Sequence, residues 1–357
     1  MDDIEVEDLT VLLAALLGSL EALGFIARHL HPPHFADVMQ AAGTPDEALR
    51  VARPRLDAWP DWLAEPRDLL RDASDQALAA FDGLRHAREE ADRSRAVFRA
   101  LGHVPRALEA LYPLAADLPP VSRFFLEPAA RGDAGLQQRL APAKPRDDTG
   151  VFHVDNEPGS RGGYSLYVPE DYAPDKARPL VMALHGGSGN GRGFLWTWLR
   201  DARSRGAILI APTAVGPTWA LSGPDPDTPN LARILDEVRG RWTIDAKRLL
   251  LTGMSDGGTF AYVSGLEAAS PFTHLAPIAA AFHPMLAQMA DPDRIHGLPI
   301  HITHGALDWM FAVELARHAQ AALAAAGARV TYRELDDLSH TYPREMNPVM
   351  LDWLDAT

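Results

Sequence analysis

The residues Leu249-Leu250-Leu251-Thr252-Gly253-Met254-Ser255-Asp256-Gly257-Gly258 decide the fold of this chain. An apolar run typical of a buried strand ends in Gly-x-Ser-x-Gly, and helix-compatible sequence follows from Thr259. A strand, a sharp turn that carries a serine, and a helix are the context of a nucleophile elbow. Gly253 and Gly257 permit the turn, and the free N–H groups of the following helix would point at the reaction centre. The stretch therefore predicts that Ser255 is a nucleophile.

The composition describes a globular protein with an ample core. The chain has 357 residues, of which 47% are hydrophobic and 23% charged, and its formal net charge is −14. This length suggests about two domains. An acidic chain without a basic block is a poor candidate for binding nucleic acid or an anionic membrane. Because the sequence has no cysteine, thiolate catalysis, disulfides and Cys-ligated metals are excluded.

Residues 1–147 are expected to form an all-helical N-terminal domain. Leucines recur at helical spacing from about residue 5 to residue 30, and Pro32-Pro33 ends that pattern. Further helices are expected to start at Thr44-Pro45-Asp46-Glu47 and to cover about 64–83, 84–101 and 105–111. A Pro- and Gly-rich stretch at about 127–149 is interpreted as a linker. The domain could serve as a cap, a lid or a dimerisation module.

Strands and helices alternate in residues 148–357, which predicts an α/β domain with a mostly parallel sheet and helices on both faces. The expected strands cover about 151–154, 164–168, 180–184, 207–210, 249–254, 275–280, 298–303 and 329–335. The expected helices cover about 193–205, 230–242, 259–268, 311–326 and 344–354. Ser255 would then lie at the carboxyl edge of the sheet, where open α/β sheets bind their ligands.

A serine nucleophile needs an imidazole to take its proton and an acid to orient that imidazole. His340 follows the last strand, and Asp308 follows the strand before it, so both fall at the same edge as Ser255. The order Ser, Asp, His is that of α/β-hydrolases. Asp336 and Asp337 are alternative acids, but close sequence neighbours of His340 rarely meet its imidazole in the required orientation. His304 is an alternative base, which we interpret as structural because it precedes the acid in its turn and would lie beneath the site.

The oxyanion of an acyl-transfer reaction needs two preorganised donors. We expect the backbone N–H of Asp256 to be one and that of Gly187 to be the other, with Ser188 as the alternative. The charged side chain of Asp256 is unusual beside a nucleophile, and we expect it to point away, in the first turn of the helix. A substrate pocket is expected from Ser188 and from aromatic and sulfur-containing side chains in strand-end loops: Trp219, Phe282, Trp309 and Met310.

The chain resembles the α/β-hydrolase superfamily, in particular the bacterial phospholipase/carboxylesterase group and the feruloyl-esterase and polyhydroxybutyrate-depolymerase-like esterases. The matching pieces are Leu184-His185-Gly186-Gly187, the Ser255 elbow, His304-Gly305-x-x-Asp308 and Ser339-His340. This resemblance covers about 160–357. It implies an α/β-hydrolase fold and a serine carboxylesterase that forms an acyl-serine intermediate on a small-molecule ester. A serine peptidase, a thioesterase or an acyltransferase would use the same triad.

We expect no cofactor and no metal. The loop that begins at His185 lacks the lysine of a P-loop, and the Ser255 elbow departs from a dinucleotide fingerprint. His29, His31 and His34 lack a carboxylate at helical spacing. The apolar stretch Val11–Leu20 is too short to span a bilayer, and the N-terminus lacks the basic region of a secretory signal. The simplest expectation is a cytoplasmic protein, and the helical domain could join two copies of it into a homodimer.

Overall fold

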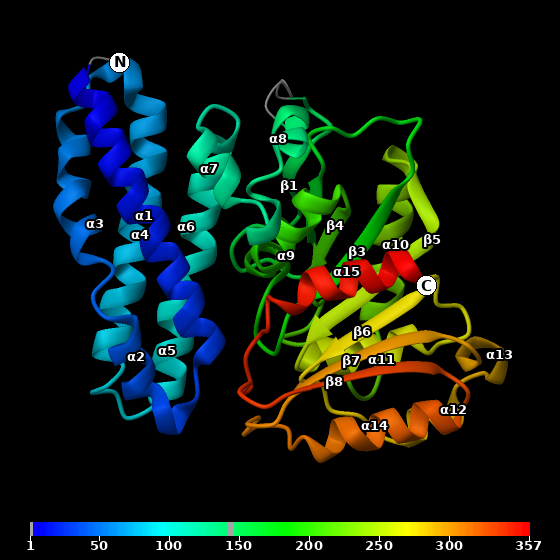
Figure 1. Ribbon diagram of the computed structural model, residues 1–357. Coiled ribbons are helices and arrows are strands. Elements are labelled where there is room, and N and C mark those ends of the chain that lie inside the picture. The colour runs from blue at the N-terminus through cyan, green and yellow to red at the C-terminus, as the bar shows by residue number, and fades with distance from the viewer. Residues whose placement is uncertain (1–2, 141–145) are drawn as a thin grey trace. The chain divides into compact units, whose positions relative to one another are not determined.

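The computed structural model describes residues 3–140 and 146–357, and the chain divides into two compact units at residue 142. The first unit is helical and is coloured from blue to green-cyan in Figure 1. Its α-helices are α1 (Asp3–His29), α2 (Phe35–Ala42), α3 (Glu47–Ala52), α4 (Ala64–His86), α5 (Arg93–Leu101), α6 (His103–Leu111), α7 (Pro119–Phe124) and α8 (Ala134–Leu140). Short 3-10 helices cover Pro32–His34, Arg53–Ala58, Asp61–Leu63, Tyr112–Ala115 and Pro128–Ala130.

The helix boundaries correct three expectations. Gly83 does not end a helix but lies inside α4. Glycine is needed there because α5 packs so closely that a β-carbon on Gly83 would lie 2.7 Å from the β-carbon of Ala100. Helix α3 begins at Glu47, and the Asp46 side chain binds Arg50 and Arg85 instead of capping the helix. The segment expected to be a linker contains α8, whose Leu136 is buried. Residues 141–145 of that segment lie outside the described residues.

Helix α1 is longer than the apolar stretch that marked it in the sequence. It contains an 18-residue window with a mean hydropathy of 2.1, and by length and composition alone it could cross a membrane, contrary to the expectation from residues 11–20. Leu12, Leu16 and Leu23 are buried, however, and α1 packs against α2, α3 and α4. A core helix of a soluble protein has the same properties.

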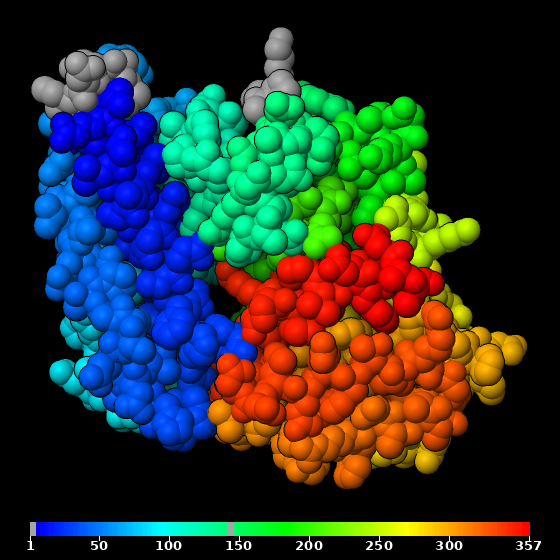
Figure 2. All heavy atoms as spheres, in the orientation of Figure 1, coloured from blue at the N-terminus to red at the C-terminus, as the bar shows by residue number. Residues whose placement is uncertain are grey.

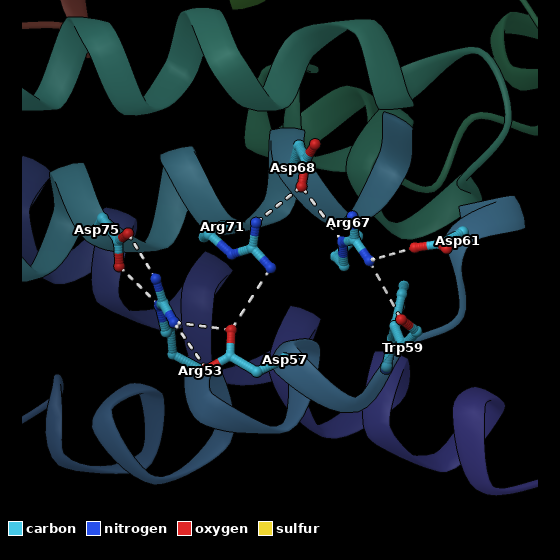
Figure 3. A network of polar contacts seen from close by, with 8 residues as sticks. All are labelled: Arg53, Asp57, Trp59, Asp61, Arg67, Asp68, Arg71 and Asp75. Atoms are coloured by element: carbon cyan, nitrogen blue, oxygen red, sulfur yellow. Dashed lines mark hydrogen bonds and ion pairs between the residues drawn. The ribbon is translucent and has the colours of Figure 1, made fainter. Parts of the chain in front are cut away.

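Alternating charges connect α4 to the segment before it, as Figure 3 shows. Arg53 forms two 2.8 Å hydrogen bonds with Asp75 and also contacts Asp57. Arg71 lies between Asp57, at 3.4 Å, and Asp68, at 2.8 Å. Each exposed pair contributes little by itself, so the network matters mainly because several charges share partners.

The second unit contains an eight-stranded sheet in the order β1-β2-β4-β3-β5-β6-β7-β8. Strands β1 and β2 are antiparallel to their neighbours, and the pairs from β4 to β8 are parallel. The strands are β1 (Gly150–Val154), β2 (Tyr164–Val168), β3 (Arg178–Leu184), β4 (Ile208–Pro212), β5 (Ile244–Met254), β6 (His274–Ile278), β7 (Pro299–Gly305) and β8 (Arg329–Leu335). This is the α/β architecture that the sequence predicted.

Helices cover both faces of this sheet (Figure 1). Helices α9 (Gly191–Arg205) and α15 (Met346–Ala356) contact each other on one face, and the outer side of α15 is visible in Figure 2. Helices α10 (Asp227–Arg241), α11 (Asp256–Gly265) and α14 (Glu314–Ala325) share one apolar core with the other face. The short helices α12 (Met285–Met289) and α13 (Pro292–Ile295) follow β6. From β3 the chain first continues to β4, on one side of β3, and then crosses to β5, on the other side. The direction of the strand order therefore reverses at β3, which is the switch point of the sheet.

The buried imidazoles His274 and His301 predict an acid sensitivity of this unit. Burial lowers the pKa of each to about 4, and both rings lie edge-on to Trp353. In the unfolded chain these two imidazoles take up protons near pH 6.5, whereas in the folded protein they stay neutral down to about pH 4. The free energy of unfolding is therefore highest above pH 6.5 and falls as the pH decreases toward 4. In a His301→Phe variant, the free energy of unfolding should depend less steeply on pH. The slope should decrease by up to about 1.4 kcal/mol per pH unit. Denaturant unfolding between pH 7 and pH 4.5 measures it, and equal slopes in both proteins would contradict the prediction.

Candidate active site

Ser255 occupies the sharp turn between β5 and α11. Its backbone has φ 55° and ψ −120°, which a non-glycine residue adopts only when the surroundings impose it. The Ser255 N–H donates to the carbonyl of Ile278 at 2.9 Å, and the Ser255 carbonyl accepts from the N–H of Thr259 at 2.8 Å. The strained turn is therefore held by β6 on one side and by α11 on the other.

The turn also requires glycine at its two flanking positions. A β-carbon on Gly257 would lie 2.4 Å from the carbonyl oxygen of His185 and 2.5 Å from that of Leu184. A β-carbon on Gly253 would lie 2.5 Å from the Gly257 carbonyl. The start of α11 thus approaches the end of β3 more closely than any side chain permits, and this approach brings Ser255 to the switch point of the sheet.

The structure brings Ser255, His340 and Asp308 together at the carboxyl ends of β5, β8 and β7. His340 Nε2 lies 3.0 Å from Ser255 Oγ, and His340 Nδ1 lies 2.8 Å and 3.1 Å from the two carboxylate oxygens of Asp308. All three side chains are buried. The alternative acids Asp336 and Asp337 are exposed, so neither takes the place of Asp308.

The loop after β7 prepares Asp308 to stay ionised. Its Oδ1 accepts hydrogen bonds from the N–H groups of Met310, at 2.9 Å, and Phe311, at 2.8 Å. Burial alone would raise the pKa of Asp308, but the hydrogen bonds from His340 and Phe311 outweigh it and hold this pKa below the usual value. An ionised carboxylate at this position can orient His340 and stabilise it when it carries a proton.

His304 lies behind the acid, as the sequence suggested. Its Nε2 lies 2.9 Å from the carbonyl of Phe311 and 3.4 Å from Asp308 Oδ2. The ring is fully buried, and its Nδ1 has no hydrogen-bond partner. The imidazole that contacts Ser255 is that of His340, and His304 supports the loop that presents Asp308.

The expected oxyanion loop lies beside the serine. A β-carbon on Gly186 would lie 3.7 Å from Ser255 Cβ, which places the Gly186-Gly187 peptide next to the nucleophile. Asp256 is the first residue of α11, where backbone N–H groups have no partner within the helix. Ser188 has a φ of 58° and is exposed. Gly187 and Asp256 thus both belong to segments that adjoin Ser255.

The side chains expected to form a substrate pocket are not all near the surface. Trp219 is 2% exposed, stacks on Phe260 and donates from Nε1 to the carbonyl of His185 at 2.7 Å, so it is a core residue that supports the loop after β3. Phe282 is also buried, edge-on to Tyr262. Trp309 and Met310 are about half exposed in the loop that carries Asp308. Of the side chains expected to form the pocket, Trp309, Met310 and the exposed Ser188 are therefore accessible to a ligand.

The sequence did not reveal two residues that hold the loop after β3. The buried ring of His185 accepts from the Ala214 N–H at 3.1 Å through Nε2, and burial lowers its pKa to about 4. Arg161, between β1 and β2, donates to the carbonyls of Gly189, at 2.8 Å, and Gly216, at 2.7 Å. In the sequence, His185 stood out as the start of a glycine-rich loop and as part of the matching piece Leu184-His185-Gly186-Gly187, but not as a support of that loop, and no pattern marked Arg161.

Within the described ranges, no group of three or more His, Asp or Glu side chains is arranged to hold a metal ion. The helical-unit histidines His31 and His34 lie with their ring centroids 5.1 Å apart.

The strand order and the elbow define the second unit as an α/β-hydrolase domain. Residues 228–357 match the model of a family described as Phospholipase/Carboxylesterase. This match and the relatives below confirm the resemblance to α/β-hydrolase esterases that the motifs indicated.

Two curated relatives are esterases. A bifunctional acetylxylan esterase/xylanase of Neocallimastix patriciarum is 31% identical over 126 residues, which are 34% of this chain and 18% of that protein. Feruloyl esterase C of Emericella nidulans is 29% identical over 117 residues, which are 30% of this chain and 43% of that protein. A solved thermostable esterase has 22% identity and a TM-score of 0.48, over 59% of this chain and 63% of that one. The chain thus spans less than half the length of both curated relatives.

The close approach at Gly257 predicts a large difference between two glycine-to-alanine substitutions. Gly257→Ala would push a methyl group into two backbone carbonyls of β3 and should destabilise the protein by about 2 kcal/mol or more. Gly240→Ala is the matched control, because Gly240 lies in α10 with nothing within 4 Å of the added carbon. Alanine is the better helix former, so this control should be neutral or stabilising. Thermal unfolding compares them, and a fully stable Gly257→Ala protein would contradict the structure.

Proposed function

We propose that this protein is a serine carboxylesterase that hydrolyses small-molecule carboxylic esters through an acyl-serine intermediate. The observation that carries the proposal is the hydrogen-bonded series from Ser255 Oγ through His340 to Asp308, with separations of 3.0 Å and 2.8 Å. These are the distances over which an imidazole can take a hydroxyl proton while a carboxylate orients it. The family match over 228–357 supports the same class of reaction.

In the first half of the reaction, Ser255 Oγ attacks the ester carbonyl carbon and its proton passes to His340 Nε2. The carbonyl oxygen becomes an oxyanion, which the N–H groups of Gly187 and Asp256 stabilise. The imidazolium then gives its proton to the leaving alkoxide, so that an alcohol departs and an acyl-serine remains. Asp308 keeps Nδ1 of His340 protonated throughout, because its carboxylate contacts that nitrogen.

In the second half, a water molecule replaces the alcohol. His340 takes a proton from the water, whose oxygen attacks the acyl carbon, and then returns that proton to Ser255 Oγ as the carboxylic acid leaves. Every step is a proton or acyl transfer among Ser255, His340 and the substrate, so the proposed reaction requires no cofactor.

Replacing the nucleophile tests this proposal. A Ser255→Ala variant should lose at least about 10⁴-fold of the kcat for p-nitrophenyl acetate or butyrate, because no acyl-enzyme can form. Asp308→Asn should lose about 10³- to 10⁴-fold, since an amide favours the wrong tautomer of His340. The thermal unfolding temperature of each variant serves as the control for folding. Residual esterase activity of Ser255→Ala near the wild-type level would overturn the assignment.

A peptidase, thioesterase or acyltransferase would use the same triad, so substrates must separate these reactions. A panel of matched p-nitrophenyl esters, an anilide and a thioester, all with the same acyl group, compares kcat/KM across the three bonds. Ester hydrolysis should exceed anilide hydrolysis by several orders of magnitude, and added alcohol should not divert the acyl group from water. A preference for the anilide or the thioester would replace the esterase proposal.

A further inference from the structure

The sequence suggested that the Asp256 side chain points away from the site, and this expectation is wrong. Asp256 lies at the first position of α11, and its carboxylate is directed toward the loop that follows β3. A β-carbon on Gly187 would lie 2.8 Å from Asp256 Oδ2 and 3.9 Å from Oδ1. The carboxylate thus lies against Gly187, whose N–H is one of the two proposed oxyanion donors.

A second contact fixes the direction of this carboxylate. The Thr218 hydroxyl, in the loop after β4, donates to Asp256 Oδ2 at 2.6 Å. Asp256 therefore touches two loops at once, those after β3 and β4, while its own backbone belongs to the turn that presents Ser255. Thr218 and Asp256 are both half-buried, so their hydrogen bond is partly protected from water.

The oxyanion loop needs such a contact because of its function. The Gly187 N–H has to stay unpaired to bind an oxyanion, and it donates to no acceptor among the residues that the structure covers. The flanks of the loop are tied down: the carbonyl of His185 accepts from Trp219, and that of Gly189 accepts from Arg161. Between these two points, the contact with Asp256 holds the Gly187 peptide from the side.

We propose that the carboxylate of Asp256 is a positioning group of the oxyanion hole, held by Thr218 and packed against Gly187 so that the Gly187 N–H faces the substrate. The inference rests on the proposed esterase function. The negative charge of the Asp256 carboxylate is not the useful property, because a negative charge near the developing oxyanion destabilises that oxyanion. The useful properties are the shape of the planar side chain and the oxygen that accepts from Thr218.

Four variants separate these properties, with p-nitrophenyl acetate as the substrate. Asp256→Asn keeps the shape and an acceptor oxygen for Thr218, so its kcat should stay at least several-fold above that of Asp256→Ala. Asp256→Ala and Thr218→Val remove the support and should each lower kcat about tenfold with KM changed less than threefold. Asp236→Ala, an exposed position in α10, is the matched control and should leave both constants unchanged. A loss of activity in Asp256→Asn as large as in Asp256→Ala would overturn the proposal.

The contact with Gly187 gives a more specific test. Gly187→Ala places a methyl group against Asp256 Oδ2 and should lower kcat about 100-fold or more. In the double variant Gly187→Ala/Asp256→Ala the obstruction is absent, so kcat should recover at least tenfold relative to Gly187→Ala. Additive losses, with the double variant worse than either single variant, would show that Asp256 does not act through Gly187. If Gly187→Ala does not fold, the comparison of Asp256→Asn with Asp256→Ala decides alone.

Labelling of Ser255 by a fluorophosphonate keeps this inference separate from the proposed function. The reagent phosphonylates an activated serine, and its phosphonyl oxygen occupies the oxyanion hole. Its rate should follow kcat across the variants, whereas unfolding temperatures should stay within a few degrees. If wild-type protein neither hydrolyses esters nor reacts with the reagent, the esterase function itself is wrong. If it does both and the variants show no rescue, only the role of Asp256 is wrong.

Discussion

The close approach between the start of α11 and the end of β3 is the constraint on which the site depends. Gly257 lies so near the carbonyls of Leu184 and His185 that only a hydrogen atom fits on its α-carbon. This approach sets the distance from Ser255 to the loop that follows β3. The positive φ of Ser255 costs about 1–3 kcal/mol, and the hydrogen bonds of its backbone with Ile278 and Thr259 hold it in place.

The site has an ionised carboxylate at one end and a neutral imidazole at the other. Asp308 receives donors from Met310, Phe311 and His340, which keep it ionised despite burial. At the other end, burial lowers the pKa of His185 to about 4 and outweighs the opposing charge of Asp256, so the neutral form of the ring is favoured. The negative charge of the acid is thus compensated where it supports His340, and the structure places no imidazolium within the loop that should bind the oxyanion.

The sequence predicted the sheet and the meeting of Ser255, Asp308 and His340 because each depends on local pattern. Buried parallel strands are continuous apolar runs, and the residues that follow them must meet at one edge of the sheet. The supporting contacts could not be predicted in the same way. Arg161 bonds carbonyls at Gly189 and Gly216, far from it in the chain, and the core position of Trp219 depends on its stacking with Phe260. Nothing in their local sequence encodes these partners.

The direction of the Asp256 side chain was predicted wrongly for the same reason: it depends on tertiary contacts and not on local sequence. Considered alone, an acid in the first turn of a helix is explained by the helix dipole and needs no other role. The tertiary structure adds a threonine donor on one side and a glycine on the other. The loop after β3 has a backbone hydrogen bond of its own, from the Gly189 N–H to the Gly186 carbonyl at 3.1 Å, but the Gly187 N–H takes no part in it. Side chains from neighbouring segments therefore add to its support. Arg161, Trp219 and Asp256 are those side chains, and they lie on three different segments of the chain.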